Sequence, residues 1–367
     1  MRPLTLLALL ARALSTPSGP STKPIDLFVA GDDGVSNYRI PSLLRTPRGT
    51  LLAVAEARSA ESDCKDKWLV LRRSEDNGTT WSPASILFKP QGAGQTGGNA
   101  VAVYDVVRGT AMIVFAIGDA AHCNPTLWTL VTTSADEGLT WSNPTNISAQ
   151  LGEWAGTLPG PGTAAQVPAG LPHAGRILVP AHNGAYANDV VYYSDDGGVT
   201  WGVGDTKLPK MDEAVLAVLN DGTVLLNMRN NHLSSCKCRA VSRSTDGGMS
   251  FSAISYDAAL ISPVCQASMV TVGDALFFAN PASTSERVNI TIRRSDDGGK
   301  SWLPQTYLVN MGAASAGYSC LASGDATVVD HTTGRTYGAI LYESMGASGA
   351  VASISFRLFP LDLRPDS

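Results

Sequence analysis

The chain has 367 residues, of which 44% are hydrophobic and 16% charged, so it is long enough to bury a sizeable core. Its formal net charge of −5 argues against nucleic acid as a partner, because neutralising phosphates requires a basic face. An anionic ligand would therefore need a local cluster of arginines. Beyond residues 1–20, no stretch approaches the roughly 20 apolar residues that a membrane span needs.

Residues 1–20 differ in composition from the rest of the chain. Arg2 precedes an apolar run, Leu4–Leu10, and small residues follow before Pro17. This order is typical of a signal peptide, although Arg12 shortens the apolar core. We therefore predict a signal peptide or a disordered N-terminal tail at residues 1–20. The protein is expected to be secreted or to enter the secretory or lysosomal pathway, and a cytoplasmic location stays open.

An octapeptide of the form Ser-x-Asp-x-Gly-x-Thr/Ser-Trp/Phe occurs five times, at 74–81, 134–141, 194–201, 244–251 and 295–302. Successive copies begin 60, 60, 50 and 51 residues apart. A period of this size, with room for four strands per unit, is typical of a propeller blade. Runs that predict strands precede the copies, for example Trp68–Arg72, Val190–Tyr193 and Ile290–Ile292.

Each octapeptide is predicted to form a tight turn between two strands. Its aspartate can accept hydrogen bonds from backbone N–H groups inside the turn, and its glycine can supply a positive φ. The closing aromatic residue is expected to pack under the turn against its own sheet. The repeat therefore indicates architecture, and its aspartates are not candidate catalysts.

Five copies leave one blade of a six-bladed ring without an octapeptide. We expect this blade to pair an N-terminal strand near Ile25–Ala30 with the C-terminal run Ala352–Leu363, which closes the ring. The predicted fold is thus all-β, with residues 21–367 forming one six-bladed β-propeller.

The cysteines and histidines show no spacing typical of a metal site. Cys236 and Cys238 are separated by one residue, too few for a zinc hook, and the five histidines form no HExxH pattern. In an exported chain, an even number of cysteines permits disulfides without determining their pairing. We predict no metal and no cofactor, and we interpret the histidines as ordinary strand or loop residues.

The octapeptides resemble the Asp boxes of sialidases. Tyr38–Pro41, which has the sequence Tyr-Arg-Ile-Pro, resembles the Phe/Tyr-Arg-Ile-Pro motif of the same family. The resemblance extends from about Ile25 to Leu361. It implies a retaining exo-α-sialidase that removes terminal α-linked sialic acids from glycoproteins, glycolipids such as gangliosides, or oligosaccharides.

The resemblance also implies which residues bind the substrate. Sialic acid carries a carboxylate on its anomeric carbon, and planar guanidinium groups can hold a carboxylate bidentately. In this family three arginines from different blades do so, and the matching residues are Arg39, Arg229 and Arg287. Glu343 matches the glutamate that supports the first arginine, and it would orient Arg39 and balance its charge.

Tyr318 matches the family's nucleophile, since sialidases replace the usual carboxylate with a tyrosine. A neutral phenol approaches an anomeric centre that bears a carboxylate with less repulsion than an acidic side chain would meet. Because a tyrosine with a pKa of about 10 is a poor nucleophile, it needs an adjacent base. The predicted base is Glu213, which precedes Arg229 by 16 residues with the hairpin signal Asn220–Gly222 between them. Asp212 is the rival carboxylate.

Asp63 matches the family's general acid/base, on a loop that leads into the strand Trp68–Leu71. A carboxyl group on a loop can protonate the departing oxygen and later activate water. Glu61 and Asp66 are competing carboxylates on this loop. Arg58 matches an arginine that lines the pocket in this family, and the alternative is an ion pair within the loop.

Two other functions fit parts of the pattern. A trans-sialidase uses the same residues but passes the sugar to an acceptor, and such members tend to have a tryptophan two residues before the third arginine. This chain has Ser285 there. A non-catalytic Asp-box propeller, such as a lectin domain, would lose the tyrosine, the glutamate and the arginines that this chain retains. Hydrolysis is therefore the predicted activity, with sialylated glycans as the partners.

Overall fold

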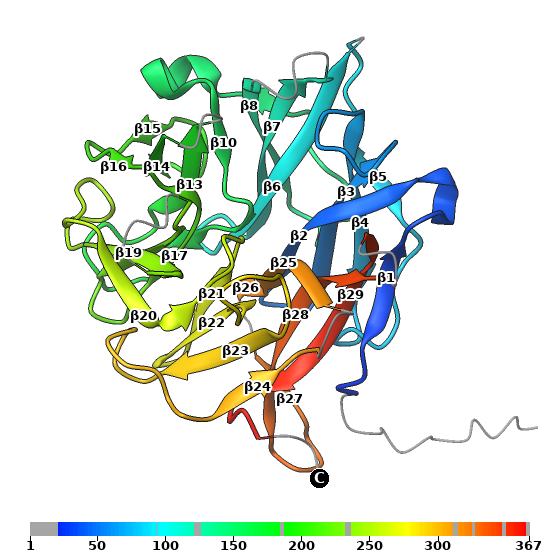
Figure 1. Ribbon diagram of the computed structural model, residues 1–367. Coiled ribbons are helices and arrows are strands. Elements are labelled where there is room, and N and C mark those ends of the chain that lie inside the picture. Colours follow the sequence, from blue (N-terminus) through cyan, green and yellow to red (C-terminus); the bar gives the residue numbers. More distant parts are fainter. Residues whose placement is uncertain are drawn as a thin grey trace, which may run out of the picture.

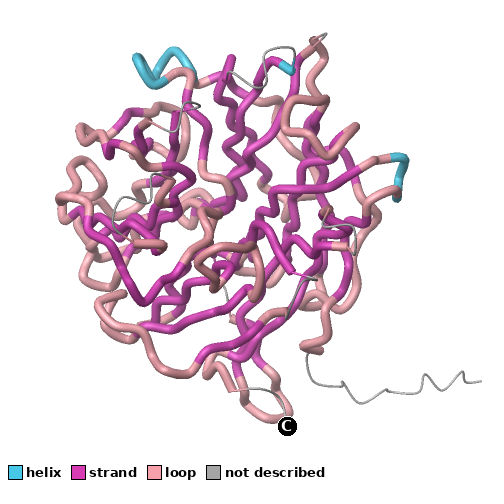
Figure 2. Tube along the Cα trace, in the orientation of Figure 1, coloured by secondary structure: helices cyan, strands magenta, loops and turns pink. Residues whose placement is uncertain are grey.

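The computed structural model describes residues 21–92, 94–120, 126–183, 187–231, 236–310, 315–324, 327–346 and 350–364. The predicted signal peptide or tail, residues 1–20, lies outside the described residues. Six sheets stand in a ring around a central axis, so the predicted six-bladed β-propeller is confirmed (Figure 1). The short 3₁₀ helices η1 (Asp32–Gly34) and η3 (Ser148–Trp154) lie in the connections between strands (Figure 2). Within the described ranges, no helix is long and apolar enough to cross a bilayer.

Each blade is a sheet of four main strands that follow one another from the axis of the ring to its rim. Blade 1 contains β2 (Asn37–Arg45), β3 (Leu51–Arg58), β4 (Lys67–Ser74) and β5 (Ser85–Phe88). Blade 2 contains β6 (Gln95–Asp105), β7 (Thr110–Asp119), β8 (Thr126–Ser134) and β9 (Thr145–Asn146). Blade 3 contains β10 (Thr157–Pro159), β13 (Ile177–Asn183), β14 (Asn188–Ser194) and β15 (Gly202–Val203).

The second half of the chain continues the ring in sequence order. Blade 4 contains β17 (Asp212–Val218), β18 (Val224–Arg229), β19 (Cys238–Ser244) and β20 (Ser255–Ile261). Blade 5 contains β21 (Ser268–Val272), β22 (Ala275–Pro281), β23 (Ile290–Ser295) and β24 (Thr306–Leu308). Blade 6 contains β25 (Ser315–Leu321), β28 (Thr336–Met345), β29 (Val351–Pro360) and β1 (Ile25–Val29). Short additional strands are β11 (Gly162–Thr163), β12 (Ala165–Gln166), β16 (Leu208–Pro209), β26 (Ser323–Gly324) and β27 (Val328–Val329).

The two ends of the chain close the ring in blade 6, as predicted. Strand β1 pairs antiparallel with β29, with Ile25 opposite Phe356 and Val29 opposite Ser353. The Ser353 hydroxyl also donates to the Asp26 carboxylate at 3.0 Å. The N-terminal strand is therefore the outer strand of a blade whose other main strands come from the end of the chain.

The octapeptides form turns between the third and fourth strands of blades 1 to 5, and the predicted turn chemistry is present. In blade 4, Asp246 accepts hydrogen bonds from the Ser250 N–H at 2.9 Å and from the Ser244 hydroxyl at 2.7 Å. Gly248 has a φ of +85°, which a side chain would penalise. Its N–H donates to the Ser244 oxygen at 2.9 Å. Each aspartate thus replaces water inside a turn.

The closing aromatic residues contact more than their own sheets. Trp302 packs against Phe278 of its own blade, as expected, with ring centroids 5.7 Å apart. Trp81, however, packs edge-on against Phe356 of the neighbouring blade 6, with centroids 5.0 Å apart. A Cβ on Gly78 would collide with the same Phe356 ring, so the turn needs glycine to approach the adjoining blade. The octapeptide turns therefore also join neighbouring blades.

Hydrophobic packing lies mainly between neighbouring sheets. One cluster joins Leu52 and Val54 of blade 1 to Ile113 and Phe115 of blade 2, all fully buried. Equivalent clusters join the other neighbouring blades. This packing leaves the centre of the ring to the ends of the inner strands, where polar side chains gather.

Candidate active site

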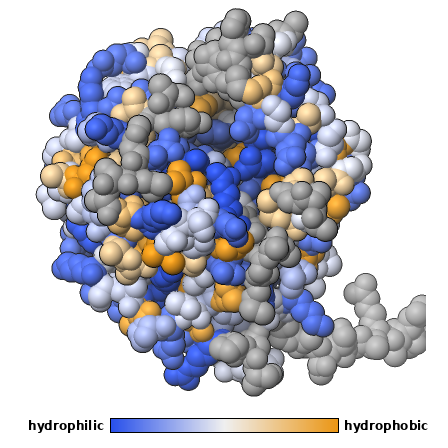
Figure 3. Space-filling view, viewed as in Figure 1, coloured by the Kyte–Doolittle hydropathy of each residue, from blue (hydrophilic) through white to orange (hydrophobic). Residues whose placement is uncertain are grey.

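The predicted site residues meet at one end of the inner strands. They come from β2 (Arg39), the end of β3 and its following loop (Arg58, Asp63), β17 and β18 (Glu213, Arg229), the loop after β22 (Arg287), and β25 and β28 (Tyr318, Glu343). Figure 3 shows hydrophilic residues concentrated near the middle of the face that it presents. A cavity of about 540 Å³ lies toward the other ends of the strands, lined by residues such as Val103, Leu216 and Met269, and contains none of the predicted site residues.

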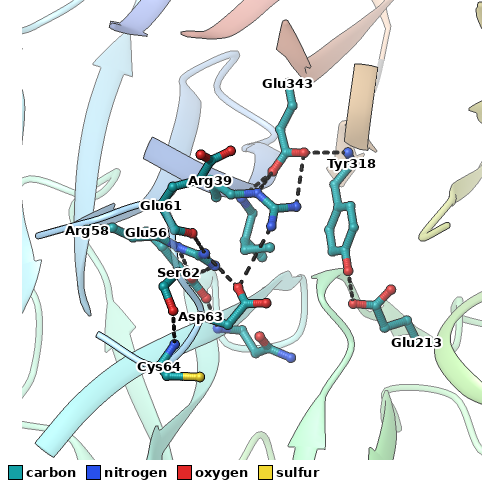
Figure 4. Close-up of polar contacts among 12 residues, drawn as sticks. Arg39, Glu56, Arg58, Glu61, Ser62, Asp63, Cys64, Glu213, Tyr318 and Glu343 are labelled. Atoms are coloured by element: carbon teal, nitrogen blue, oxygen red, sulfur yellow. Dashed lines mark hydrogen bonds and ion pairs between the residues drawn. The ribbon is translucent and has the colours of Figure 1, made fainter. Parts of the chain in front are cut away.

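Arg39 is held by Glu343, which is completely buried. The Arg39 Nε donates to Glu343 Oε1 at 2.9 Å and its Nη2 donates to Oε2 at 3.3 Å. Glu343 also accepts the backbone N–H groups of Ile40 at 3.1 Å and Tyr318 at 2.8 Å. One carboxylate thereby fixes a guanidinium group and two strands from different blades (Figure 4).

The backbone at Ile40 is unusual for a β-branched residue. Its φ is +58°, and the pairing of β2 with β3 shifts register between Arg39 and Ser42. A positive φ at isoleucine is a steric outlier that the surroundings must stabilise. The bond from the Ile40 N–H to Glu343 supports the distortion and aims Arg39 toward the centre.

Tyr318 donates a short hydrogen bond from its hydroxyl to Glu213 Oε1 (Figure 4). The Arg229 Nη1 donates to Glu213 Oε2 at 2.7 Å and to the Tyr318 oxygen at 3.2 Å. Burial, and then the negative charge of Glu213, raise the pKa of Tyr318 well above 10, so the phenol is neutral. Burial, the largest single effect, raises the pKa of Glu213, but Arg229 and the hydrogen bond from Tyr318 contribute to a net lowering of that pKa. A neutral phenol therefore faces an ionised carboxylate.

Two guanidinium groups lie over the Tyr318 ring. The Arg39 guanidinium carbon is 5.1 Å from the ring centroid, and the Arg287 carbon is 5.6 Å from it. The Arg287 Nη2 reaches the Val264 carbonyl at 3.5 Å. The three arginines and the phenol thus form one cluster, suited to an anionic ligand that sits against the tyrosine.

Asp63 lies on the opposite side of Arg39 from Glu343, with its side chain 64% exposed. It accepts a hydrogen bond from the Arg58 Nη1 at 2.6 Å, and the Arg39 Nη1 is 3.8 Å away. Burial raises the pKa of Asp63, but Arg58, Arg39 and Lys67 together outweigh this effect and the pKa is lowered overall. Of the competing residues, Glu61 contacts Arg58 through its backbone carbonyl, which accepts a hydrogen bond from the Arg58 Nη1 at 3.2 Å. Asp63 is therefore the carboxylate of this loop that contacts both arginines.

The sequence matches known proteins over most of its length. A family model described as a BNR repeat-like domain matches residues 49–330. The chain is 35% identical over 356 residues to a sialidase of Micromonospora viridifaciens, covering 88% of this chain and 53% of that protein. It is 32% identical to a sialidase of Bacteroides fragilis strain YCH46 (90% and 63%) and 30% identical to Sialidase-2 of Mus musculus (68% and 71%). The chain belongs to the sialidase family.

This sialidase-family chain spans between half and two thirds of the length of the two bacterial relatives, 53% and 63%. Among solved structures, the Hadza microbial sialidase Hz136 matches with a TM-score of 0.75 and 27% identity, over 92% of this chain and 68% of that one. A leech intramolecular trans-sialidase matches with a TM-score of 0.72 at 18% identity, over 95% and 71%. At that identity the leech enzyme supports the shared fold alone.

Glu56 is a residue of the site that the sequence analysis missed. It is fully buried on β3 and receives the Arg58 Nη2 at 2.5 Å and the backbone N–H of Asn99 at 2.7 Å. Asn99 has a φ of +54°, and a Cβ on Gly98 would collide with the Glu56 carboxylate. Glu56 thus anchors Arg58, the residue that holds Asp63. Its sequence signal is a glutamate two residues before an arginine on one strand, where both side chains share a face.

His182, predicted from the sequence to be a strand or loop residue, lies on strand β13 and also belongs to the site region. It is 1% exposed on β13, with Nε2 3.6 Å from Asp212 Oδ1. Burial lowers the pKa of His182 to about 4, so the ring is neutral at physiological pH. The rival carboxylate Asp212 faces this histidine and Arg229 rather than the Tyr318 hydroxyl.

The cysteines divide between disulfides and buried thiols. Cys64 is disulfide-bonded, and Cys236 is bonded to Cys238. Cys265 and Cys320 are free and buried, and Cys265 packs with Tyr318 under the site. Across the described ranges, no group of three or more acidic, histidine or cysteine side chains could hold a metal ion.

Proposed function

We propose that this chain is a retaining exo-α-sialidase that hydrolyses terminal α-linked sialic acids of glycoproteins, glycolipids or oligosaccharides. The observation that carries the proposal is the hydrogen bond from the Tyr318 hydroxyl to Glu213 beneath a cluster of arginines. Family membership supports the same activity.

The arginines would bind the carboxylate of the sugar. Arg39, Arg229 and Arg287 approach the Tyr318 ring or hydroxyl from three blades. Charge-assisted bonds from planar guanidinium groups would fix the carboxylate and place the anomeric carbon next to the phenol oxygen.

In the first step, the Tyr318 oxygen attacks the anomeric carbon while Glu213 accepts the phenol proton. The bond to the aglycone oxygen breaks, and Asp63 donates a proton to that oxygen. Arg58 keeps Asp63 ionised before substrate binds, since it lowers the pKa of Asp63. The incoming carboxylate would offset the charge of Arg39, 3.8 Å from Asp63, and favour protonation of Asp63 for this step.

In the second step, Asp63 accepts a proton from a water molecule that attacks the anomeric carbon. The bond from that carbon to Tyr318 breaks, and the proton on Glu213 returns to the phenol oxygen. Two displacements at one carbon restore the original configuration, so the enzyme retains stereochemistry.

The test is release of a fluorescent aglycone from an α-ketoside of N-acetylneuraminic acid, with and without a chelator. Turnover that a chelator leaves unchanged supports a metal-free sialidase. A folded sample that binds sialosides without turnover would overturn the proposal in favour of a lectin-like propeller. The products formed with added lactose distinguish hydrolysis from transfer of the sugar to an acceptor. Ser285, in place of the tryptophan that trans-sialidases tend to have, favours hydrolysis.

We also propose that the protein is exported. The disulfides at Cys64 and between Cys236 and Cys238 support export, because disulfides persist mainly in oxidising compartments. Expression of the full chain in cultured cells, followed by assay of medium and cell extract, tests this point. Activity confined to the extract would contradict it.

A further inference from the structure

Asp212 lies directly behind the proposed site, and the proposed mechanism makes no use of it. The side chain is completely buried. Its Oδ1 accepts the backbone N–H of Glu213 at 2.8 Å, and its Oδ2 lies 3.2 Å from the Nε of Arg229. The residue therefore contacts the proposed base through the backbone and one of the substrate-binding arginines through an ion pair.

Two nitrogen atoms of the Arg229 guanidinium group, Nε and Nη1, contact other side chains. Asp212 faces Nε, while Glu213 and Tyr318 share Nη1 at 2.7 Å and 3.2 Å. Among the described residues, Nη2 has no hydrogen-bond partner, so it is the edge available to a ligand carboxylate. A guanidinium group held by an ion pair at Nε and by hydrogen bonds at Nη1 has little freedom to rotate, which keeps Nη2 aimed at the ligand.

In the part of the chain that the structure describes, five other ionisable groups surround Asp212, on its own strand and on four other strands of blades 3 and 4. They are His182 on β13, Asp189 on β14, Glu213 on β17 itself, Arg229 on β18 and Arg239 on β19. Burial raises the pKa of Asp189 well above its ordinary value, and burial lowers that of His182 to about 4, so both are neutral near pH 7. Arg239 is engaged by the Asn227 side chain at 2.7 Å. Because Asp189 and His182 are neutral near pH 7, Asp212 is the group behind Arg229 whose charge can change in this pH range.

We propose that Asp212 is a positioning residue that braces Arg229 and, by gaining or losing one proton, controls how strongly Arg229 attracts the carboxylate of the substrate. The inference rests on the proposed function, because it takes a sialic acid carboxylate as the ligand. With Asp212 neutral, Arg229 shares its charge between Glu213 and the ligand. With Asp212 ionised, a second anion lies against Arg229 and competes with the ligand.

The expected consequence is a loss of affinity as pH rises. Burial, and then the charge of Glu213, raise the pKa of Asp212 to about 7, and Arg229 opposes them. Ionisation of Asp212 adds one negative charge beside Arg229, which should change the affinity for the substrate carboxylate about tenfold. KM and the dissociation constant of free N-acetylneuraminic acid should therefore both rise about tenfold between about pH 6 and about pH 8, while kcat changes less.

The test measures KM in the fluorescent assay and the dissociation constant of N-acetylneuraminic acid by calorimetry across this pH range. In Asp212→Asn, which carries no charge at any pH, the rise should disappear. In the matched control Asp189→Asn it should persist, because Asp189 is already neutral. A wild-type affinity that does not change with pH, or an Asp212→Asn variant that keeps the rise, would overturn the inference.

The two proposals can fail separately. Absence of turnover, with calorimetry still showing the rise in wild type and its loss in Asp212→Asn, would reject the hydrolase and retain the role of Asp212. Normal turnover without that pattern rejects the role of Asp212 alone. Should Asp212→Asn not fold, carbon-13 titration of the Asp212 carboxyl in wild type decides. A pKa near the ordinary value of about 4 would then reject the inference.

Discussion

The hydroxyl of Tyr318 donates to the carboxylate of Glu213 although the two residues are 105 positions apart in the chain. They reach one another because β25 and β17 are inner strands of different blades, whose ends meet at the axis of the ring. Glu213 is tied in turn to Arg229 on the adjacent strand of its own blade. The nucleophile, the base and a substrate-binding group are therefore positioned by the packing of whole blades, and each can be tested by substitution.

Replacement of Tyr318 by phenylalanine should abolish turnover and leave the fold intact. The ring can keep its contacts with Arg39 and Arg287, while the attacking oxygen is lost. We expect kcat to fall at least about 10³-fold, because removing a nucleophile disables the catalytic unit. Binding of N-acetylneuraminic acid, measured by calorimetry, should change far less than kcat. Retention of full activity would remove Tyr318 from the mechanism.

Replacement of Arg287 by lysine should mainly weaken substrate binding. Lysine keeps the charge but cannot form two parallel hydrogen bonds to a carboxylate, and bonds to charged groups contribute about 1.5–3 kcal/mol each. KM should therefore rise roughly 10- to 100-fold. The matched control is Arg294→Lys, since Arg294 pairs with Asp296 outside the site. Equal KM values for the two variants would contradict a role for Arg287.

Replacement of Glu343 by alanine should reduce both stability and activity. The change leaves the largely buried guanidinium of Arg39 and two backbone N–H groups without their acceptor, the fully buried Glu343. Breaking a buried pair from one side costs about 3–5 kcal/mol in free energy of unfolding. Urea unfolding measures it, with Glu75→Ala as control, because the exposed pair of Glu75 and Arg73 should contribute at most about 1 kcal/mol. Similar losses in both variants would show that Glu343 has no special structural role.

Replacement of Asp63 by alanine should depend on the leaving group. An activated aryl aglycone departs without much protonation, whereas the alcohol of a natural glycan needs a proton from an acid. The rate of bond cleavage should fall about 10²- to 10⁴-fold for sialyllactose and much less for the aryl substrate. Rates for both substrates with the wild type and the variant test this expectation. An equal loss on both would argue against a general acid at position 63.

Much of the architecture could be predicted because it depends on short local patterns. The turn around Asp246 and Gly248 follows from the octapeptide alone, and ring closure follows from counting its copies. The spacing of Glu56 and Arg58 indicates their pairing, but the burial of Glu56 could not be predicted, because it depends on how closely Gly98 and Asn99 of the next blade approach it. Likewise, the neutral state of His182 results from burial that no local pattern reveals.

The pairing of β1 with β29 has a consequence for how the protein is made. During synthesis, Ile25–Val29 leaves the ribosome long before Val351–Pro360, with which it pairs, so β1 has no partner strand while five blades assemble. Arg39 likewise lacks its carboxylate partner until Glu343, 304 residues later in the chain, has been synthesised. Catalytic competence should therefore appear late and abruptly during biosynthesis, when blade 6 forms and β1 pairs with β29.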